Sequence, residues 1–155
     1  MAWTNSKIFS AFPTDSFNST ASFNVDADAL KAALFDNSIT PSQTVASAST
    51  AYGAGVWASG GQSSSTSWPA VGRPLASVAS GFSSNVYTFD AADTVSADAN
   101  CTLSGTYGCL VYNDTLTTPV ADQGLCYLYF GGVQSITSCL FTVVYNASGL
   151  FALTL

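Results

Sequence analysis

Side chains able to do acid–base or nucleophilic chemistry are scarce in this 155-residue chain, which has nine aspartates and neither histidine nor glutamate. Without histidine, a Ser-His-Asp or Cys-His site is excluded. Two facing aspartates could hydrolyse a glycoside, and Asp90 and Asp93 in FDAADTVSADAN are candidates, but aspartate is typical of turns and strand ends. Lys7 and Lys31 lie in no Ser-Lys motif. The sequence therefore predicts no catalytic residue, and the protein is not expected to be an enzyme.

Ligands for metals and cofactors are equally sparse. Asp26 and Asp28 in NVDADA could bind Ca²⁺, because hard cations prefer clustered carboxylates, but no glycine or glutamate follows at the calcium-loop positions. The glycines of GAGVWASGG have no adjacent lysine, which a phosphate-binding loop would need. We therefore expect no metal and no cofactor.

Four cysteines, Cys101, Cys109, Cys126 and Cys139, are separated by seven, sixteen and twelve residues. This spacing fits no zinc pattern, and histidine is missing for a mixed site. The start of the chain lacks a basic segment followed by a continuous apolar run, so no secretion signal is recognised and buried free thiols are expected. A disulfide between Cys109 and Cys126 across neighbouring strands is the open alternative.

The composition restricts the possible partners. Charged residues make up 8% of the chain and hydrophobic residues 48%, and the net charge is −6. Lys7, Lys31 and Arg73 are scattered, so neither nucleic acid nor a membrane is an expected partner. No segment has the length and apolarity of a membrane-spanning helix. A polar surface of hydroxyls and amides costs less to bury than one of ions, which favours a subunit covered by other proteins. Because no secretion signal is recognised, we expect the protein to be made and assembled in the cytosol.

Residues 1–20 are predicted to form an N-terminal arm. Ile8 and Phe12 are four residues apart, which suits one helical turn that Pro13 stops. So short a segment cannot bury its own aromatic side chains, so the arm either folds back onto the domain or lies on a neighbouring subunit. The second alternative makes its large apolar residues candidates for partner contact: Trp3, Ile8, Phe9, Phe12 and Phe17.

The middle of the chain is less regular. DADALKAALF suits either a short helix capped by an aspartate or a strand in which Leu30, Ala32 and Leu34 share a face. Residues 58–68 are rich in serine and glycine and predict an exposed loop. The aromatic residues near this loop are candidates for exposed partner contacts or, alternatively, for lids over the core: Tyr52, Trp57 and Trp68.

From residue 76 onward the pattern is that of short strands joined by turns. NVYTFDA, YGCLVYNDT, LCYLYFGG, CLFTVVYN and LFALTL are expected strands, and Gly131-Gly132 is expected to end the third of them. Several are apolar on both faces, so both faces should be covered, one by the core and one by a loop or another subunit. The chain is therefore predicted to be all-β: an antiparallel β-sandwich or barrel-like domain over residues 21–155, with the N-terminal arm.

The series YTFDAADTVS, YGCLVYNDT, CYLYFGGVQS and FTVVYNASGLFALTL, with DADALKAALFDNSITPSQT upstream, resembles a family of small virion proteins of tailed bacteriophages. The likeness covers residues 25–155 apart from the serine-rich loop. It implies an all-β, commonly trimeric structural component of the phage particle, often attached to the outside of the head. It also implies that residues 29–35 form a strand. The family offers no catalytic motif, and the four cysteines depart from its pattern.

The expected function is that of a capsid decoration (cement) protein that binds the outside of the head lattice and stabilises it. Its expected partners are the major capsid protein and further copies of itself in a homotrimer. It would be assembled in the host cytoplasm and reside on the capsid exterior of the virion. One alternative is a minor tail or fibre-associated protein that contacts host-surface glycans through the loop aromatics. A secreted carbohydrate-binding or adhesive domain is a third hypothesis.

Overall fold

Three long strands with apolar residues on both sides organise the fold. They are β2 (Leu30–Asp36), β8 (Cys101–Asn113) and β9 (Gly124–Cys139) in the computed structural model, which describes residues 3–58 and 60–154. Both β2 and β9 pair antiparallel with β8, which lies between them. Within β2, Ala32 and Leu34 pack on one side of the sheet and Ala33 and Phe35 on the other. Because successive side chains of a strand alternate between faces, both faces of this sheet must be buried.

Short strands complete this main sheet. β1 (Lys7–Ile8) pairs with the outer edge of β9, whereas β3 (Gln62–Ser63) and β4 (Arg73–Pro74) both pair with the outer edge of β2. The strand order is β1-β9-β8-β2-β3, with β4 beside β3 on the same edge of β2. All of these pairings are antiparallel. The main sheet thus joins the N-terminal strand β1 to β9, which is more than a hundred residues further along the chain.

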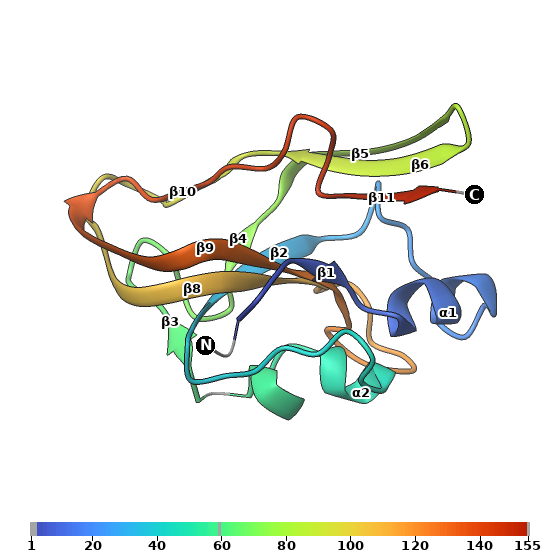
Figure 1. Cartoon of the computed structure of the whole chain (residues 1–155), viewed down its shortest axis with the longest axis horizontal. Coiled ribbons are helices and arrows are strands. Elements are labelled where there is room, and N and C mark those ends of the chain that lie inside the picture. The colour runs from blue at the N-terminus through green and yellow to red at the C-terminus, as the bar shows by residue number, and fades with distance from the viewer. Residues whose placement is uncertain (1–2, 59, 155) are drawn as a thin grey trace.

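A second layer covers one face of the main sheet (Figure 1). It contains β5 (Ala76–Ser83), β6 (Val86–Ala92) and β11 (Phe151–Thr154) in the order β11-β6-β5, and the small pair β7 (Thr94–Val95) and β10 (Thr142–Val143). Phe89, Phe141 and Phe151 from this layer join the core cluster that includes Leu34 and Val111 of the main sheet. The arrangement confirms the predicted all-β class and is sandwich-like, not a closed barrel.

The other face of the main sheet is covered by the chain itself. The cover consists of residues 37–57, with α2 (Ser47–Thr50) and the 3₁₀ helix η1 (Gly55–Trp57), together with the N-terminal segment (Figure 1). Trp57 packs edge-on against Phe35, with ring centroids 5.1 Å apart, and lies 5.9 Å from Trp3. The prediction that both faces are covered is confirmed for the main sheet, whose second cover is the chain itself. It is wrong for residues 140–144, where Leu140 and Val144 are exposed.

The predicted arm is part of the domain, as far as residues 3–20 show; residues 1–2 lie outside the described residues. Ile8 is in β1 and not in a helical turn before Pro13. The helix α1 (Ala11–Phe17) instead contains Pro13 in its first turn, where the missing N–H leaves no intrahelical hydrogen bond unmade. The expectation of a helix stopped by Pro13 was therefore wrong.

Two glycines make room for the N-terminal aromatic residues. A Cβ atom on Gly108 would lie 2.5 Å from a ring carbon of Trp3, and one on Gly124 would lie 2.8 Å from a ring carbon of Phe9. A Cβ atom would also lie 2.3 Å from the carbonyl oxygen of Leu128 at Gly108 and 2.5 Å from that of Thr50 at Gly124, so a larger residue at either position would displace both backbone and aromatic ring. The strands β8 and β9 are thus shaped to receive residues 3–9.

A buried carboxylate fixes α1 to the rest of the domain. Asp15 accepts hydrogen bonds from the Ser47 hydroxyl (2.6 Å) and from the side-chain amide of Gln123 (2.7 Å). Asp15 and Gln123 are both buried, and hydrogen bonds to a buried charged group are stronger than those between neutral groups. This contact joins α1, α2 and the segment that enters β9.

The remaining expectations about strands are met in part. Residues 30–36 form a strand, as the family resemblance implied, and Phe151–Thr154 forms the expected last strand. Gly131 and Gly132, predicted to end a strand, lie inside β9, where both have positive φ and the register with β8 shifts between Thr106 and Gly108. Glycine here produces a bulge in a continuing strand and does not end it.

Replacing Phe9, which is fully buried, by alanine should lower the free energy of unfolding by about 3–5 kcal/mol, because the cavity would open between the N-terminal segment and the main sheet. The exposed Phe17 is the matched control, and Phe17→Ala should change stability by less than about 0.5 kcal/mol. Urea unfolding followed by tryptophan fluorescence measures both. Equal, small effects would show that the N-terminal segment is a detachable arm after all.

Candidate interaction surface

The structure places the five predicted partner-contact residues very differently. Trp3, Phe9 and Phe12 are buried within their own domain, and Ile8 is half-buried in β1. The proposal that these aromatics contact a partner is wrong for the three buried residues, because the two core clusters of the domain contain them. Phe17, at the end of α1, remains 75% exposed.

The loop aromatics are not exposed either. Trp57 and Trp68 have no exposed surface, and the Trp68 indole N–H donates to the carbonyl oxygen of Ala32 on β2 (3.1 Å). Tyr52 is half-buried and stacks on Tyr112, with ring centroids 4.9 Å apart. The prediction of exposed contact residues is therefore wrong for both tryptophans, and the alternative of lids over the core is correct for them.

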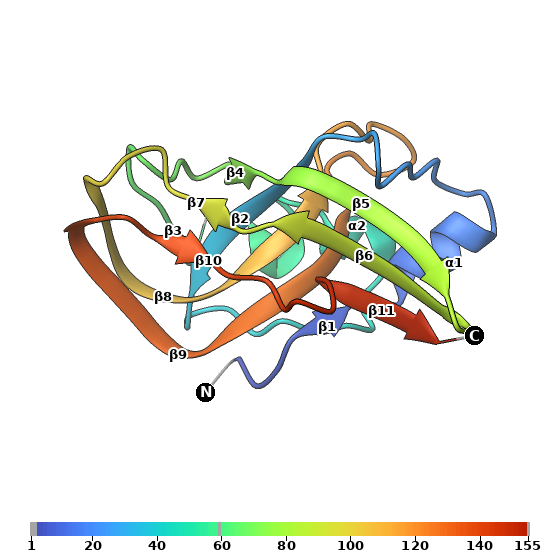
Figure 2. The same ribbon diagram turned by 90° about the horizontal axis from the view of Figure 1, so that it is seen from above.

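An apolar groove is lined by residues of α1 and of the second layer. These elements lie at the end of the molecule that holds the C-terminal strand β11 (Figures 1 and 2). The volume of the groove is about 240 Å³. This aromatic groove is lined by residues from α1, the segment after it, the β5–β6 hairpin and β11: Phe12, Pro13, Ser16, Phe17, Phe23, Val25, Phe82, Tyr87 and Leu153. None of these residues is charged.

Three neighbouring strands supply one wall of the aromatic groove. Phe82 is paired with Tyr87 across the β5–β6 hairpin, and Tyr87 is paired with Leu153 across β6 and β11. Directly opposed residues share a face, so these side chains form one row across the sheet. The hairpin turn contains Ser84 and Asn85, both with positive φ, as the tight turns that suit twisted hairpins require.

The floor of the aromatic groove consists of packed aromatic rings, and its outer residues are exposed. Phe12 is held edge-to-face by Phe23 and Phe151, with ring centroids 4.9 Å and 5.6 Å apart. Phe17 and Phe82 are 75% and 61% exposed, which is unusual for phenylalanine. The sequence analysis named Phe12 and Phe17 as partner-contact candidates but did not name Phe82. The sequence pattern that could have indicated Phe82 is an aromatic residue directly before the hairpin turn Ser83-Ser84-Asn85.

A second hollow, whose lining mixes polar and apolar residues, lies between β9 and the segment around β10. These two strands meet at the opposite end of the molecule from α1 (Figure 2). This β9–β10 cleft runs between the two strands and is lined in part by Tyr129, Phe130 and Val144. Leu140 and Val144 are 57% and 71% exposed, and Val133 on the far half of β9 is exposed as well. Phe141, Val143 and Tyr145 point to the other face and are buried, so residues 140–145 alternate as in the expected strand CLFTVVYN, although only Thr142–Val143 is paired as a strand.

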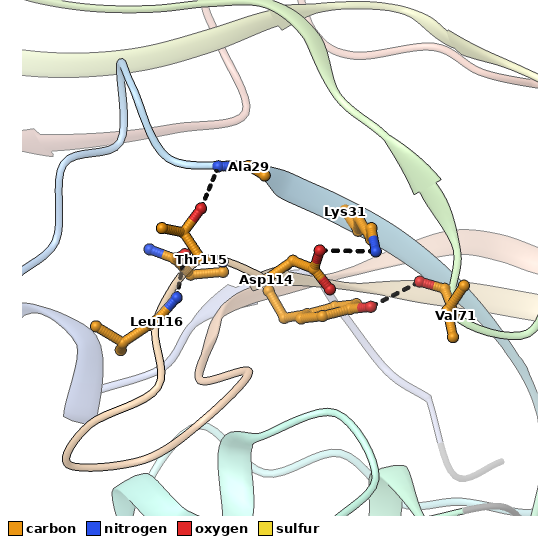
Figure 3. Close-up of polar contacts among 8 residues, drawn as sticks. Ala29, Lys31, Val71, Asp114, Thr115 and Leu116 are labelled. Atoms are coloured by element: carbon orange, nitrogen blue, oxygen red, sulfur yellow. Dashed lines mark hydrogen bonds and ion pairs between the residues drawn. The ribbon is translucent and has the colours of Figure 1, made fainter.

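A polar cluster orders the loop between β8 and β9 (Figure 3). Lys31 forms an ion pair with Asp114 (2.7 Å), the backbone N–H of Ala29 donates to Thr115 (2.7 Å), and Tyr112 donates to the carbonyl of Val71 (2.7 Å). The pKa of Asp122 is raised, first by burial and then by the nearby negative charge of Asp114, against the lowering effect of Lys31. These contacts position a loop, and nothing in them resembles a nucleophile–base pair.

The other aspartates considered for chemistry have structural contacts. Asp93 accepts a hydrogen bond from the backbone of Tyr145 (2.9 Å), and Asp28 accepts from Asn113 (2.6 Å). Asp26 accepts from the Ser80 hydroxyl (2.8 Å). Within residues 3–58 and 60–154, no group of three metal-ligating acidic or cysteine side chains comes together, and no helix is long and apolar enough to cross a membrane.

Cys109 and Cys126 are buried free thiols on neighbouring strands. Cys109 is paired with Leu128 and Cys126 with Val111, so the two cysteines are diagonal neighbours, for which Cα separations are about 7–8 Å and too long for a disulfide. Burial raises the pKa of both thiols, that of Cys126 to about 12. The expectation of buried free thiols is confirmed for this pair and for Cys101, whereas Cys139 is exposed.

Comparison of the chain with known protein families, with curated proteins and with solved structures gives no match. The resemblance to virion proteins of tailed phages therefore stays a hypothesis.

Replacing Asp122 by asparagine should stabilise the protein near neutral pH by up to about 1 kcal/mol, since the carboxylate is partly exposed and screened. Because the pKa of Asp122 is raised in the folded protein, its carboxyl group does not destabilise the fold below its ordinary pKa of 3.8, where it is protonated. As the pH rises through the raised pKa, the group becomes charged and the free energy of unfolding falls. The gain should therefore vanish below pH 3.8. Asparagine also tolerates the positive φ of this position. Urea unfolding of the wild type and the variant, at neutral pH and below pH 3.8, measures the change in the free energy of unfolding. An equal change at the two pH values would contradict this electrostatic explanation.

Proposed function

We propose that this chain is a structural virion protein of a tailed bacteriophage: a capsid decoration protein that binds the outside of the head lattice and stabilises it. The observation that carries the proposal is the aromatic groove, with Phe17 and Phe82 exposed beside a floor of packed aromatic rings. Exposed apolar patches of this kind mark protein–protein contacts, whose centres are rich in aromatic and poor in charged residues. The family resemblance supplies the identity of the particle.

The groove suits an apolar segment of the major capsid protein. Its lining has no charge, so binding such a segment would remove no ion from water. The hydroxyl-rich, charge-poor composition of the whole chain suits extensive burial against neighbours for the same reason. A charged or strongly hydrophilic partner would find no complementary group in the groove.

The position of the aromatic groove and of the β9–β10 cleft suits a subunit of a lattice. The aromatic groove and the β9–β10 cleft lie at opposite ends of the molecule (Figures 1 and 2). If the groove contacts the capsid, the cleft is free to contact another copy of the chain, which agrees with the homotrimer that the family resemblance implies. A glycan-binding tail protein is favoured less, because Trp57 and Trp68 are buried and cannot stack on sugars.

Quantitative mass spectrometry of purified particles of the phage that encodes this chain tests its location. A copy number comparable to that of the major capsid protein is expected, because a decoration protein occupies the whole lattice. A few copies per particle would place it on the tail or at one vertex instead. Its absence from purified particles would contradict a role in the virion altogether.

The double substitution Phe17→Ser and Phe82→Ser should weaken binding to capsids that lack the protein by at least about tenfold, because it removes the exposed aromatic residues of the groove. Sedimentation of capsids with added protein measures the bound fraction. Val56→Ser is the matched control, since Val56 is also exposed but lies in η1, away from the aromatic groove and from the β9–β10 cleft. Binding of the double variant at the level of the control would exclude the groove as the contact, without affecting the copy-number result.

A further inference from the structure

Cys101 and Cys139 are opposed at the open end of the β8–β9 ladder. The ladder pairs them directly, at the end away from the 114–123 loop (Figure 2). Directly opposed residues of antiparallel strands have Cα atoms about 4.5–5.5 Å apart and side chains on the same face. A disulfide requires Cα separations of about 4.4–6.8 Å. The backbone therefore already holds this pair at a distance that a disulfide can bridge.

Local contacts keep the two strand ends together around a bulge. The backbone N–H of Ser138, a residue with positive φ, donates to the Thr102 hydroxyl (3.1 Å). The register shifts by one residue between Cys101 and Leu103, whose partner is Ile136. The extra residue is thus accommodated before Cys139, and the cysteine pair remains in register.

The two thiols differ in access to solvent. Cys139 is exposed, whereas Cys101 is buried and its sulfur lies 3.3 Å from the Ser65 hydroxyl oxygen. An oxidant in solution can therefore reach Cys139 first, and Cys101 is the neighbouring thiol that can resolve the product. Cys109 and Cys126 have no such exposed member.

We propose that Cys101 and Cys139 form a disulfide when the protein meets an oxidising environment. With glutathione disulfide as oxidant, the Cys139 thiolate attacks one of its sulfurs, forms a mixed disulfide and releases one glutathione. Cys101 then attacks the Cys139 sulfur, which forms the Cys101–Cys139 bond and releases the second glutathione. Two protein thiols are oxidised, one glutathione disulfide is reduced, and the thiol protons pass to the two glutathione thiolates through solvent.

The disulfide pins the far half of β9 to β8. That half contains Gly131 and Gly132 and is largely exposed, so few side-chain contacts hold it in place. The new bond closes a loop that contains β8 and β9. This loop restricts the conformations of the unfolded chain and so stabilises the folded protein. This inference is independent of what the protein binds.

Folded wild-type protein is incubated with glutathione disulfide, acid-quenched and digested with chymotrypsin, which can cut between the four cysteines at Tyr107, Tyr112 and Tyr127. A peptide pair linked through Cys101 and Cys139 is expected, together with a rise in Tm on the order of 10 °C that dithiothreitol reverses. Cys139→Ser should abolish both effects, and this exposed substitution leaves the core intact. Cys109→Ala is the matched control and should retain both.

Three outcomes would overturn the proposal. Glutathione that stays attached to Cys139 would show that Cys101 cannot reach the mixed disulfide. A dimer linked through Cys139 of two chains would show that the exposed thiol reacts faster between molecules than within one. A linked peptide that contains Cys109 or Cys126 would show that the strand register does not decide the pairing.

Discussion

The burial of the main sheet on both faces is the constraint on which the rest of the structure depends. Along β8, Cys109 and Val111 belong to one core cluster, and Leu110 and Tyr112 to the other. A single covering layer would leave one of these sets in water, at a cost of roughly 25 cal/mol for each Å² of apolar surface. The second β layer covers one face, so residues 37–57 and the N-terminal segment must cover the other. Segments that look like an arm and a loop are therefore part of the core.

The sequence predicts that strands apolar on both faces must be covered on both, but it does not predict which segments cover them. Alternation of apolar residues is a local pattern, and it correctly indicated most strands in the second half of the chain and the two-sided burial of β8 and of the first half of β9. It did not predict that Leu140 and Val144 would be exposed. Which segment fills the space beside Phe35 depends on contacts distant in sequence, and so Trp3 and Trp57 were misjudged. Helix and strand propensities were balanced for residues 29–35; pairing with β8 on one edge and β3 and β4 on the other decides for the strand. The aromatic groove could be predicted only in part, because it joins Phe17 and Phe82 from segments far apart in the chain.

The many hydroxyl and amide side chains do more than cover the surface. Thr94 and Tyr145 share a buried hydrogen bond of 2.8 Å, and burial raises the pKa of the tyrosine. Ser47 and Gln123 both donate to Asp15. Such contacts join segments that are remote in sequence and satisfy polar groups that would otherwise be costly to bury. A chain with few charges can therefore still hold its loops in place through hydrogen bonds. Its surface also has a low desolvation free energy to overcome when a partner covers it.

The incorporation of the N-terminal segment changes how a partner would be held. A free arm of about twenty residues would have to be ordered on binding, at roughly 1–2 kcal/mol for each residue fixed. The aromatic groove is instead preformed, since α1 is fixed through Asp15 and the groove floor is fixed by packed aromatic rings. A preformed site avoids most of the ordering cost, so a small contact can suffice. In a trimer, three such contacts would act together, and their combined strength would exceed that of each groove alone.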